Sequence, residues 1–351
     1  MVNLHSKQRN SIIDIGKGIA IILMSIGHSY CPERLDVFIP LFHMAFFFMM
    51  SGYCFSLKKV ESPKDFIWKR ITGLYFPFVK WGIVFVFLHN IFSHLLLLSD
   101  NSIYSFKEMC WKAFTTIPRF IPTEEMMGPY WFLTSLFYVS LFSYCLFWIT
   151  EKIKTKEYIR SCIFTFFYIL GFVFLHFHIN VSDHIIRSII ISFLFYSGFL
   201  WKKYQHKISY TILGTVLSFV VLLFGVFTDY HHISIPELYF ENPILFIAYS
   251  FSGCYLLLSI SSFFNRTTYI RIILAYIGEH SLTILLTNML CRRILHVFRF
   301  YILNTETPLT PPSRESLWWI VYTLFMVIAP LIIRHIYIYC KYNFQRYYSN
   351  K

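Results

Sequence analysis

Residues 12–30 read IIDIGKGIAIILMSIGHSY, an apolar stretch that contains Asp14, Lys17 and His28. At 100° per residue, the step from Lys17 to His28 is three turns plus about 20°, so both side chains share one helix face, about 16 Å apart along the axis. Ionisable groups inside a membrane helix are costly and mark a site or a pathway by default; a polar pair buried for packing is the alternative. The stretch therefore predicts a membrane helix that carries a candidate site.

The composition predicts an all-α integral membrane protein. The 351 residues are 56% hydrophobic, include 40 Phe and 25 Tyr, and are only 14% charged, which is far from the balance of a soluble domain. Apolar runs long enough to cross a membrane recur along the whole chain, so we expect one polytopic domain over residues 1–351. The ten predicted spans cover residues 12–30, 36–57, 71–98, 130–149, 159–177, 185–201, 208–227, 243–264, 274–298 and 317–340.

Lys and Arg residues are concentrated in alternate connections between these spans. By the positive-inside rule this places both termini in the cytoplasm. The net charge of +13 is then mostly a topology signal, and it does not indicate a nucleic-acid partner because no basic stripe is interleaved with exposed aromatic residues. Two long connections, 99–129 and 299–316, are predicted to face outward, either as binding elements or as plain connectors.

The second predicted span adds another imidazole. His43 lies in its outer third, and because the first two spans are joined by a short turn they pack antiparallel, which puts His43 at the depth of His28. The connection that follows is rich in cations, including Lys69 and Arg70. It is either a surface anchor on anionic membrane lipid or a binding site for a polyanionic nucleotide, to which Lys17 would also belong.

No metal site is predicted. His231 and His232 are adjacent, which is poor spacing for a metal on a helix, and no Cys or carboxylate completes a ligand set around them. The GKG sequence at residues 16–18 lacks the upstream Gly and the following Ser or Thr of a phosphate-binding loop.

Five short motifs occur in an order and at intervals that resemble the membrane acyltransferase-3 family, and within it the fucose-4-O-acetylase-like branch that modifies surface polysaccharides. They are RNSIIDIGKGIAIILMSIGHS (9–29), FHMAFFFMMSGYCF (42–55), FIWKRITGLYFPF (66–78), GPYWFLTSLF (128–137) and IGEHSLTIL (277–285). The resemblance covers essentially the whole chain, and its specificity comes from the order and spacing of the motifs.

This resemblance implies a ten-helix enzyme of the bacterial inner membrane that moves an acetyl group from cytoplasmic acetyl-CoA to a hydroxyl of a cell-surface or lipid-linked sugar. The family's basic residue and His, ten residues between them, correspond to Lys17 and His28; its Asp corresponds to Asp14 and its second-helix His to His43. The family's WFL motif falls on Trp131, Phe132 and Leu133.

The chain departs from the family pattern at two places. Of the paired arginines three residues apart, only Arg70 is present, with Gly73 at the second position. The late motif contains Glu279 and His280 and is followed by Asn288, where the family usually has a His. Glu279 and Asn288 are therefore predicted as polar contacts to the substrate.

The implied reaction suits these residues chemically. Acetyl transfer from a thioester to an alcohol needs a base for the hydroxyl proton, and a neutral imidazole suits that role. Asp14 is predicted to position Lys17 through an i,i+3 ion pair, while Lys17, Lys69 and Arg70 hold the CoA phosphates. Because a thioester is already activated, no metal is required.

Several alternatives remain open from the sequence. His28 acts as a base in direct transfer or carries the acetyl group itself, and Tyr130 and Trp131 stack on a sugar or anchor the helix at the membrane interface. Another acyl donor, such as succinyl-CoA, also fits. A lipid-linked glycan flippase or polysaccharide exporter is the main competing function, although no interrupted half-helices are evident; a membrane scaffold is a third.

Overall fold

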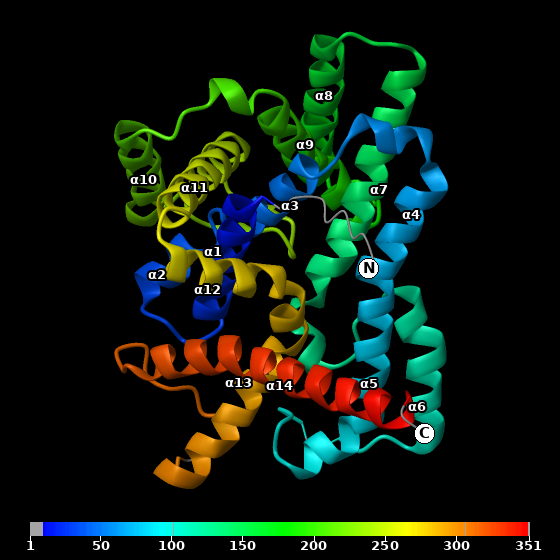
Figure 1. Ribbon diagram of the computed structural model, residues 1–351, viewed down its shortest axis with the longest axis vertical. Helices are drawn as coiled ribbons and strands as arrows, with labels where there is room; N and C mark the ends of the chain where they lie inside the picture. Colours follow the sequence, from blue (N-terminus) through cyan, green and yellow to red (C-terminus); the bar gives the residue numbers. More distant parts are fainter. Residues whose placement is uncertain (1–9, 101, 306, 350–351) are drawn as a thin grey trace.

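The chain forms an assembly of helices that cross at varied angles (Figure 1). This computed structural model describes residues 10–100, 102–305 and 307–349. The predicted all-α fold is confirmed, since within those residues the only strands form one short antiparallel hairpin, β1 (Ile233–Ser234) and β2 (Tyr239–Phe240). The cytoplasmic placement of the two ends stays a prediction, and residues 1–9 and 350–351 lie outside the described part.

The helices vary widely in length. In chain order they are α1 (Ser11–Gly27), α2 (Glu33–Phe38), α3 (His43–Tyr53), α4 (Pro63–Arg70), α5 (Phe76–His94), α6 (Phe106–Trp111), α7 (Trp131–Lys152), α8 (Glu157–His176), α9 (Asp183–Lys203), α10 (Ile212–Phe227), α11 (Pro243–Phe264), α12 (Thr268–Glu279), α13 (Ser281–Leu303) and α14 (Trp318–Ser349). Short π-helical segments at Ile71–Tyr75 and Lys112–Thr116 and 3₁₀ segments such as Glu125–Tyr130 join some of them.

Seven stretches of the described chain are long and apolar enough to cross a membrane, and an eighth is added if α12 and α13 count as one span. The predicted number of ten is therefore not confirmed. α1 has 17 residues and α10 has 16, fewer than the about 20 that a straight crossing needs. The ninth predicted span is broken, because α12 and α13 meet at His280 with a bend of 73°.

Two helix pairs approach closely through glycines. A β-carbon on Gly278 of α12 would lie 1.8 Å from the carbonyl oxygen of Asp14, and one on Gly18 of α1 would lie 2.1 Å from that of Leu274. α3 and α9 meet in the same reciprocal way through Gly52 and Gly198. Since small residues let membrane helices approach closely, these contacts fix α12 against α1 and α9 against α3.

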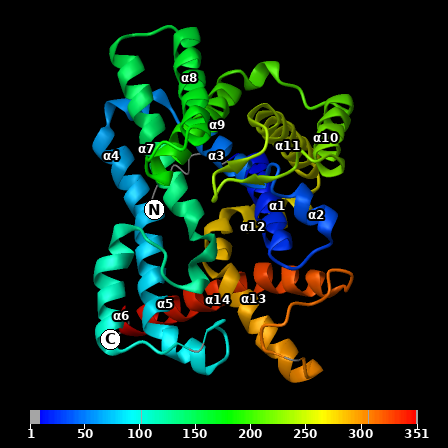
Figure 2. The ribbon, with the colours of Figure 1, turned by 180° about the vertical axis from the view of Figure 1, so that it is seen from behind.

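The two long connections differ from their predicted form. Residues 99–129 contain α6, the π-helical segment after it and the 3₁₀ segment that leads into α7. The second connection is shorter than predicted, because α13 continues to Leu303. After it the chain returns along α14, which runs across the molecule beside α13, as both views show (Figures 1 and 2).

Candidate functional site

Lys17 lies on α1, and His28 follows directly after its last residue. The side chain of Asn10 caps its first turn by accepting a hydrogen bond of 3.1 Å from the backbone N–H of Ile12. The helix ends at Gly27, three residues earlier than predicted, and the chain then turns through Tyr30, whose φ is 63°. The N–H of His28 still bonds to the carbonyl of Met24 at 3.2 Å, so His28 keeps its place at the end of the helix.

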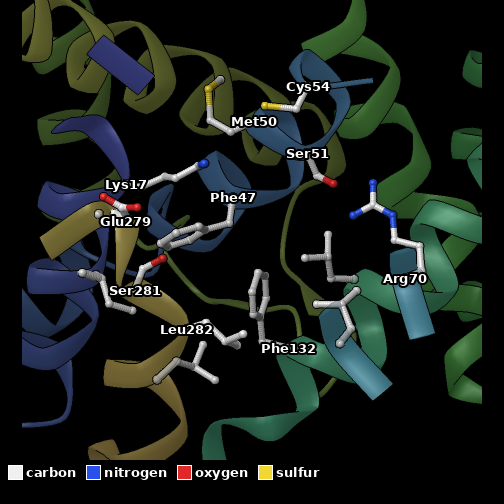
Figure 3. A pocket seen from close by; sticks show the side chains of 15 residues that line it. Lys17, Phe47, Met50, Ser51, Cys54, Arg70, Phe132, Glu279, Ser281 and Leu282 are labelled. Carbon is white, nitrogen blue, oxygen red and sulfur yellow. The ribbon is translucent and has the colours of Figure 1, made fainter. Parts of the chain in front are cut away.

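Lys17 lines a cavity of about 290 Å³, which we call the lysine cavity. Figure 3 shows Lys17 and Glu279 on one wall and Arg70 on the opposite wall. The cavity is lined by residues of α1, α3, α4, α7, α12 and α13 and by one residue of the π-helical segment after α4: Lys17, Ile21, Phe47, Met50, Ser51, Cys54, Arg70, Leu74, Phe132, Leu136, Gly278, Glu279, Ser281, Leu282 and Leu285. It therefore combines two cations, one carboxylate and an apolar floor.

The charged groups of the lysine cavity are held in place by their neighbours. The Nζ atom of Lys17 lies 3.7 Å from a carboxylate oxygen of Asp14, so the predicted i,i+3 ion pair is present. Asp14 is buried, and the pair orients the lysine from within its own helix. Across the cavity, the Arg70 guanidinium lies 5.0 Å from the ring centre of Phe66; this cation–π contact limits where the guanidinium can go.

A second cavity, of about 210 Å³, contains both predicted histidines, and we call it the histidine cavity. Its polar side chains are His28, His43 and Ser234. The rest of the wall comes from α1, the turn before α3, α3, the segment before α7, α7, the β-hairpin and α13: Met24, Pro40, Met44, Pro129, Trp131, Ile233, Ile235, Pro236 and Leu285. The two imidazoles that were predicted to lie at one depth thus share one cavity.

The tautomer of His43 follows from its hydrogen bond. Its Nδ1 atom lies 2.7 Å from the carbonyl oxygen of Ile39, and a carbonyl only accepts, so Nδ1 carries the proton and donates. In the neutral ring, Nε2 is then left with a lone pair. His43 is therefore prepared to accept a hydrogen bond from a hydroxyl group in the cavity.

Leu285 of α13 lines both cavities. The cations line the first cavity and the imidazoles line the second; Lys17 of α1 belongs to the first, and His28, the residue directly after α1, belongs to the second. The two cavities therefore adjoin at Leu285.

Four predicted site residues lie elsewhere than expected. Lys69 is exposed on α4 and lines neither cavity. Glu279 lies in the lysine cavity, away from the histidines. Tyr130 is completely buried, and its hydroxyl donates a hydrogen bond of 2.7 Å to the carbonyl of Leu286; of the predicted aromatic pair, only Trp131 faces a cavity. Asn288 is also buried and bonds to Ser25 at 3.1 Å.

Sequence reasoning missed the hairpin segment 233–236 as part of the site. Its only local signal is the alternation of Ile233, Ser234 and Ile235 before a proline, which is typical of a half-buried strand. The pattern does not indicate which surface of the protein such a strand covers. The polar residues Ser51 and Ser281 of the lysine cavity were missed for the same reason.

Comparison with known proteins gives one match. A family model described as "Acyltransferase domain" matches residues 10–335. No curated protein and no solved structure matches the chain. The matched range includes both cavities and all of their lining residues.

Proposed function

The chain belongs to the membrane acyltransferase-3 family, and we propose that it transfers an acetyl group from cytoplasmic acetyl-CoA to a hydroxyl of a cell-surface or lipid-linked sugar, across the bacterial inner membrane. One observation carries the proposal: the lysine cavity and the histidine cavity share Leu285 as a wall and are both lined by α1. A donor with phosphates and an acceptor with a hydroxyl need these two environments.

The lysine cavity is the proposed donor site. Lys17 and Arg70 face each other across it, and the CoA phosphates need cations that also donate hydrogen bonds. The positive-inside rule predicts that this end of α1 lies at the cytoplasmic side, which is the side that cytoplasmic acetyl-CoA would reach. The pantetheine arm would lie on the apolar floor formed by Phe47, Phe132 and Leu282.

The histidine cavity is the proposed site of transfer. The acceptor oxygen forms a bond to the acetyl carbon, the carbon–sulfur bond breaks, and the hydroxyl proton passes to His28 and from there to the CoA thiolate. His43, with its free Nε2, orients the acceptor hydroxyl. The same imidazole of His28 also serves the route in which it first carries the acetyl group. Trp131 offers an apolar face to the sugar ring.

A glycan flippase or exporter is the second candidate, and one observation favours it. The 73° break between α12 and α13 has the form of the interrupted helices at the binding sites of transporters, a feature that the sequence did not show. Glu279, the last residue before this break, lines the lysine cavity. A transporter would need no base at His28.

The deciding experiment replaces His28 with Gln in cells that make the glycan. We expect the O-acetyl groups on that glycan, measured by mass spectrometry, to fall by about 10²–10⁴-fold, the usual contribution of a general base, while the amount of glycan at the surface stays unchanged. The matched control is His94→Gln, an exposed histidine at the end of α5 that lines neither cavity. Loss of the glycan itself would favour the exporter, and unchanged acetylation would exclude His28 from the reaction.

A further inference from the structure

The β-hairpin between α10 and α11 forms one side of the histidine cavity. Residues 233–236 contact the space that His28, His43 and Trp131 enclose from the other sides. The hairpin pairs Ile233 with Phe240 and Ser234 with Tyr239, and Phe240 packs on Phe246 of α11, with ring centres 4.7 Å apart. Strand pairing and this packing thus hold the segment in place as one wall of the cavity.

Arg187 of α9 holds this wall in place. Its Nε atom donates a hydrogen bond of 3.0 Å to the carbonyl of Ile235, and its Nη2 atom donates one of 2.5 Å to the carbonyl of Pro236. The arginine is only 5% exposed. A buried cation is costly unless it is well bonded, so this arginine favours a single position of the two residues that it binds.

The lining of the histidine cavity carries no permanent charge. Among the described residues, no Asp, Glu, Lys or Arg side chain contributes to it; its polar side-chain groups are two imidazoles, the Ser234 hydroxyl and the indole N–H of Trp131. A carboxylate or phosphate that entered would lose its water and meet no cation among the lining side chains, and the guanidinium of Arg187 behind the wall is already bonded to two backbone carbonyls. A neutral ring loses only weaker hydration, and its apolar face suits Trp131 and the prolines.

The cavity is also small. Its volume of about 210 Å³ is below the about 300–1,000 Å³ of sites for drug-sized ligands, so it suits one sugar ring.

From these observations we infer that segment 233–236, fixed by Arg187, selects the acceptor and admits a single uncharged sugar ring to the two histidines, excluding rings that bear a carboxylate or a phosphate. This inference rests on the proposed acetyl transfer, and it names the substrate class of that reaction. Arg187 is a positioning residue, because it acts through the backbone of Ile235 and Pro236.

The first test locates the acetyl group. The surface glycan of cells with the wild-type protein is compared with that of His28→Gln cells by mass spectrometry and NMR. The acetyl group that depends on His28 should lie on a neutral monosaccharide. An acetyl group on a uronic acid or a phosphorylated sugar overturns the inference and leaves the proposed transfer intact, whereas the absence of any His28-dependent acetyl group overturns the proposed transfer itself.

The second test changes the wall. Ser234→Trp fills the cavity and should lower O-acetylation at least tenfold, with the Kd for acetyl-CoA unchanged because the lysine cavity is untouched. Tyr239→Trp is the control, since Tyr239 is the strand partner of Ser234 but is 54% exposed and lines no part of the cavity. Wild-type acetylation by Ser234→Trp contradicts the inference.

The third test addresses Arg187 in membrane vesicles supplied with labelled acetyl-CoA and with the glycan stripped of acetyl groups by mild alkali. Arg187→Gln should raise the KM for the glycan about tenfold while kcat stays within twofold. Arg160→Gln is the control, an arginine equally buried on α8 that pairs with Glu157 and should leave that KM unchanged. An unchanged KM in Arg187→Gln refutes the positioning role; if that protein fails to accumulate, the Ser234 and Tyr239 variants decide.

Discussion

The side-chain amide of Asn288 donates a hydrogen bond of 3.1 Å to the hydroxyl of Ser25, and both residues are completely buried. This contact joins α13 to the last turn of α1, directly after Met24 of the histidine cavity. Ser25 precedes His28 by three residues, and Asn288 follows Leu285, the shared wall residue, by three. In the proposed transfer, this bond would hold the imidazole of His28 in position relative to Leu285, where the two cavities adjoin.

Removing this bond should lower the rate of transfer more than the stability of the protein. Hydrogen bonds between membrane helices contribute about 0.6 kcal/mol on average, and the Ser25 hydroxyl also donates to the carbonyl of Ile21. We expect Asn288→Ala and Ser25→Ala to unfold close to the wild-type temperature. Each should lower kcat, and the double variant should lower it no further than either single variant. The measurement is a double-mutant cycle on kcat; independent, additive losses would show that the bond does not couple the two helices.

Arg70 and Lys69 are neighbours in the sequence but should differ in their effect on the donor. Arg70 faces the lysine cavity, whereas Lys69 is exposed on α4 and lies outside it. Arg70→Met and Lys17→Met should each raise the Kd for acetyl-CoA about tenfold, as the loss of a charge-assisted hydrogen bond worth about 1.5 kcal/mol implies. Calorimetry on purified protein measures the Kd. Lys69→Met is the control, and an equal loss there would move the donor site to the surface of α4.

A larger side chain at position 285, where the two cavities adjoin, should separate the proposed donor site from His28. Leu285→Trp is expected to keep the Kd for acetyl-CoA within a few-fold of wild type, because the cations of the lysine cavity remain. Transfer should fall at least a hundredfold, since the acetyl group no longer reaches His28. Ile294→Trp, on an exposed position of the same helix, controls for the added bulk. Wild-type transfer by Leu285→Trp would mean that the donor reaches His28 by another path.

The carboxyl of Glu124 should make stability depend on pH. Burial raises the pKa of Glu124, while its hydrogen bond with His89, 2.7 Å between Oε2 and Nδ1, acts in the opposite direction. A carboxyl with a raised pKa in the folded state contributes stability that is fully present below the unfolded pKa, about 4.3 for Glu, and is lost as the pH rises through the folded pKa. The stability of Glu124→Gln relative to wild type should therefore increase with pH.

Thermal unfolding of detergent-solubilised Glu124→Gln and wild-type protein between pH 4 and pH 8 measures this difference. Glu108→Gln, an exposed carboxyl on α6, is the control for the general effect of removing a negative charge from the same connection. A difference between Glu124→Gln and wild type that stays constant over this range would contradict the raised pKa.

The sequence determined that this is an all-α membrane protein and that Asp14, Lys17 and His28 lie along one helix. A segment that crosses the membrane must satisfy its backbone N–H and C=O groups by hydrogen bonds within itself, as a helix does. Apolar runs of spanning length are therefore a local signal, and they predicted the all-α fold. The spacing of Asp14, Lys17 and His28 is likewise set within one helix. The Asp14–Lys17 ion pair is present as predicted, and Lys17 and His28 each line a cavity at the predicted places along α1 and its C-terminal end.

The tertiary structure decided everything that depends on contacts between distant segments. Helix packing buried Tyr130 and Asn288 and broke the ninth predicted span at His280. It placed Leu285 between the cavities and brought residues 233–236, held by Arg187, to the histidines. The periodicity of one segment indicates which of its sides is apolar, but not which other segment covers that side. The covering segment is chosen by the close approach of whole helices, such as the approach of α1 and α12 that Gly18 and Gly278 permit.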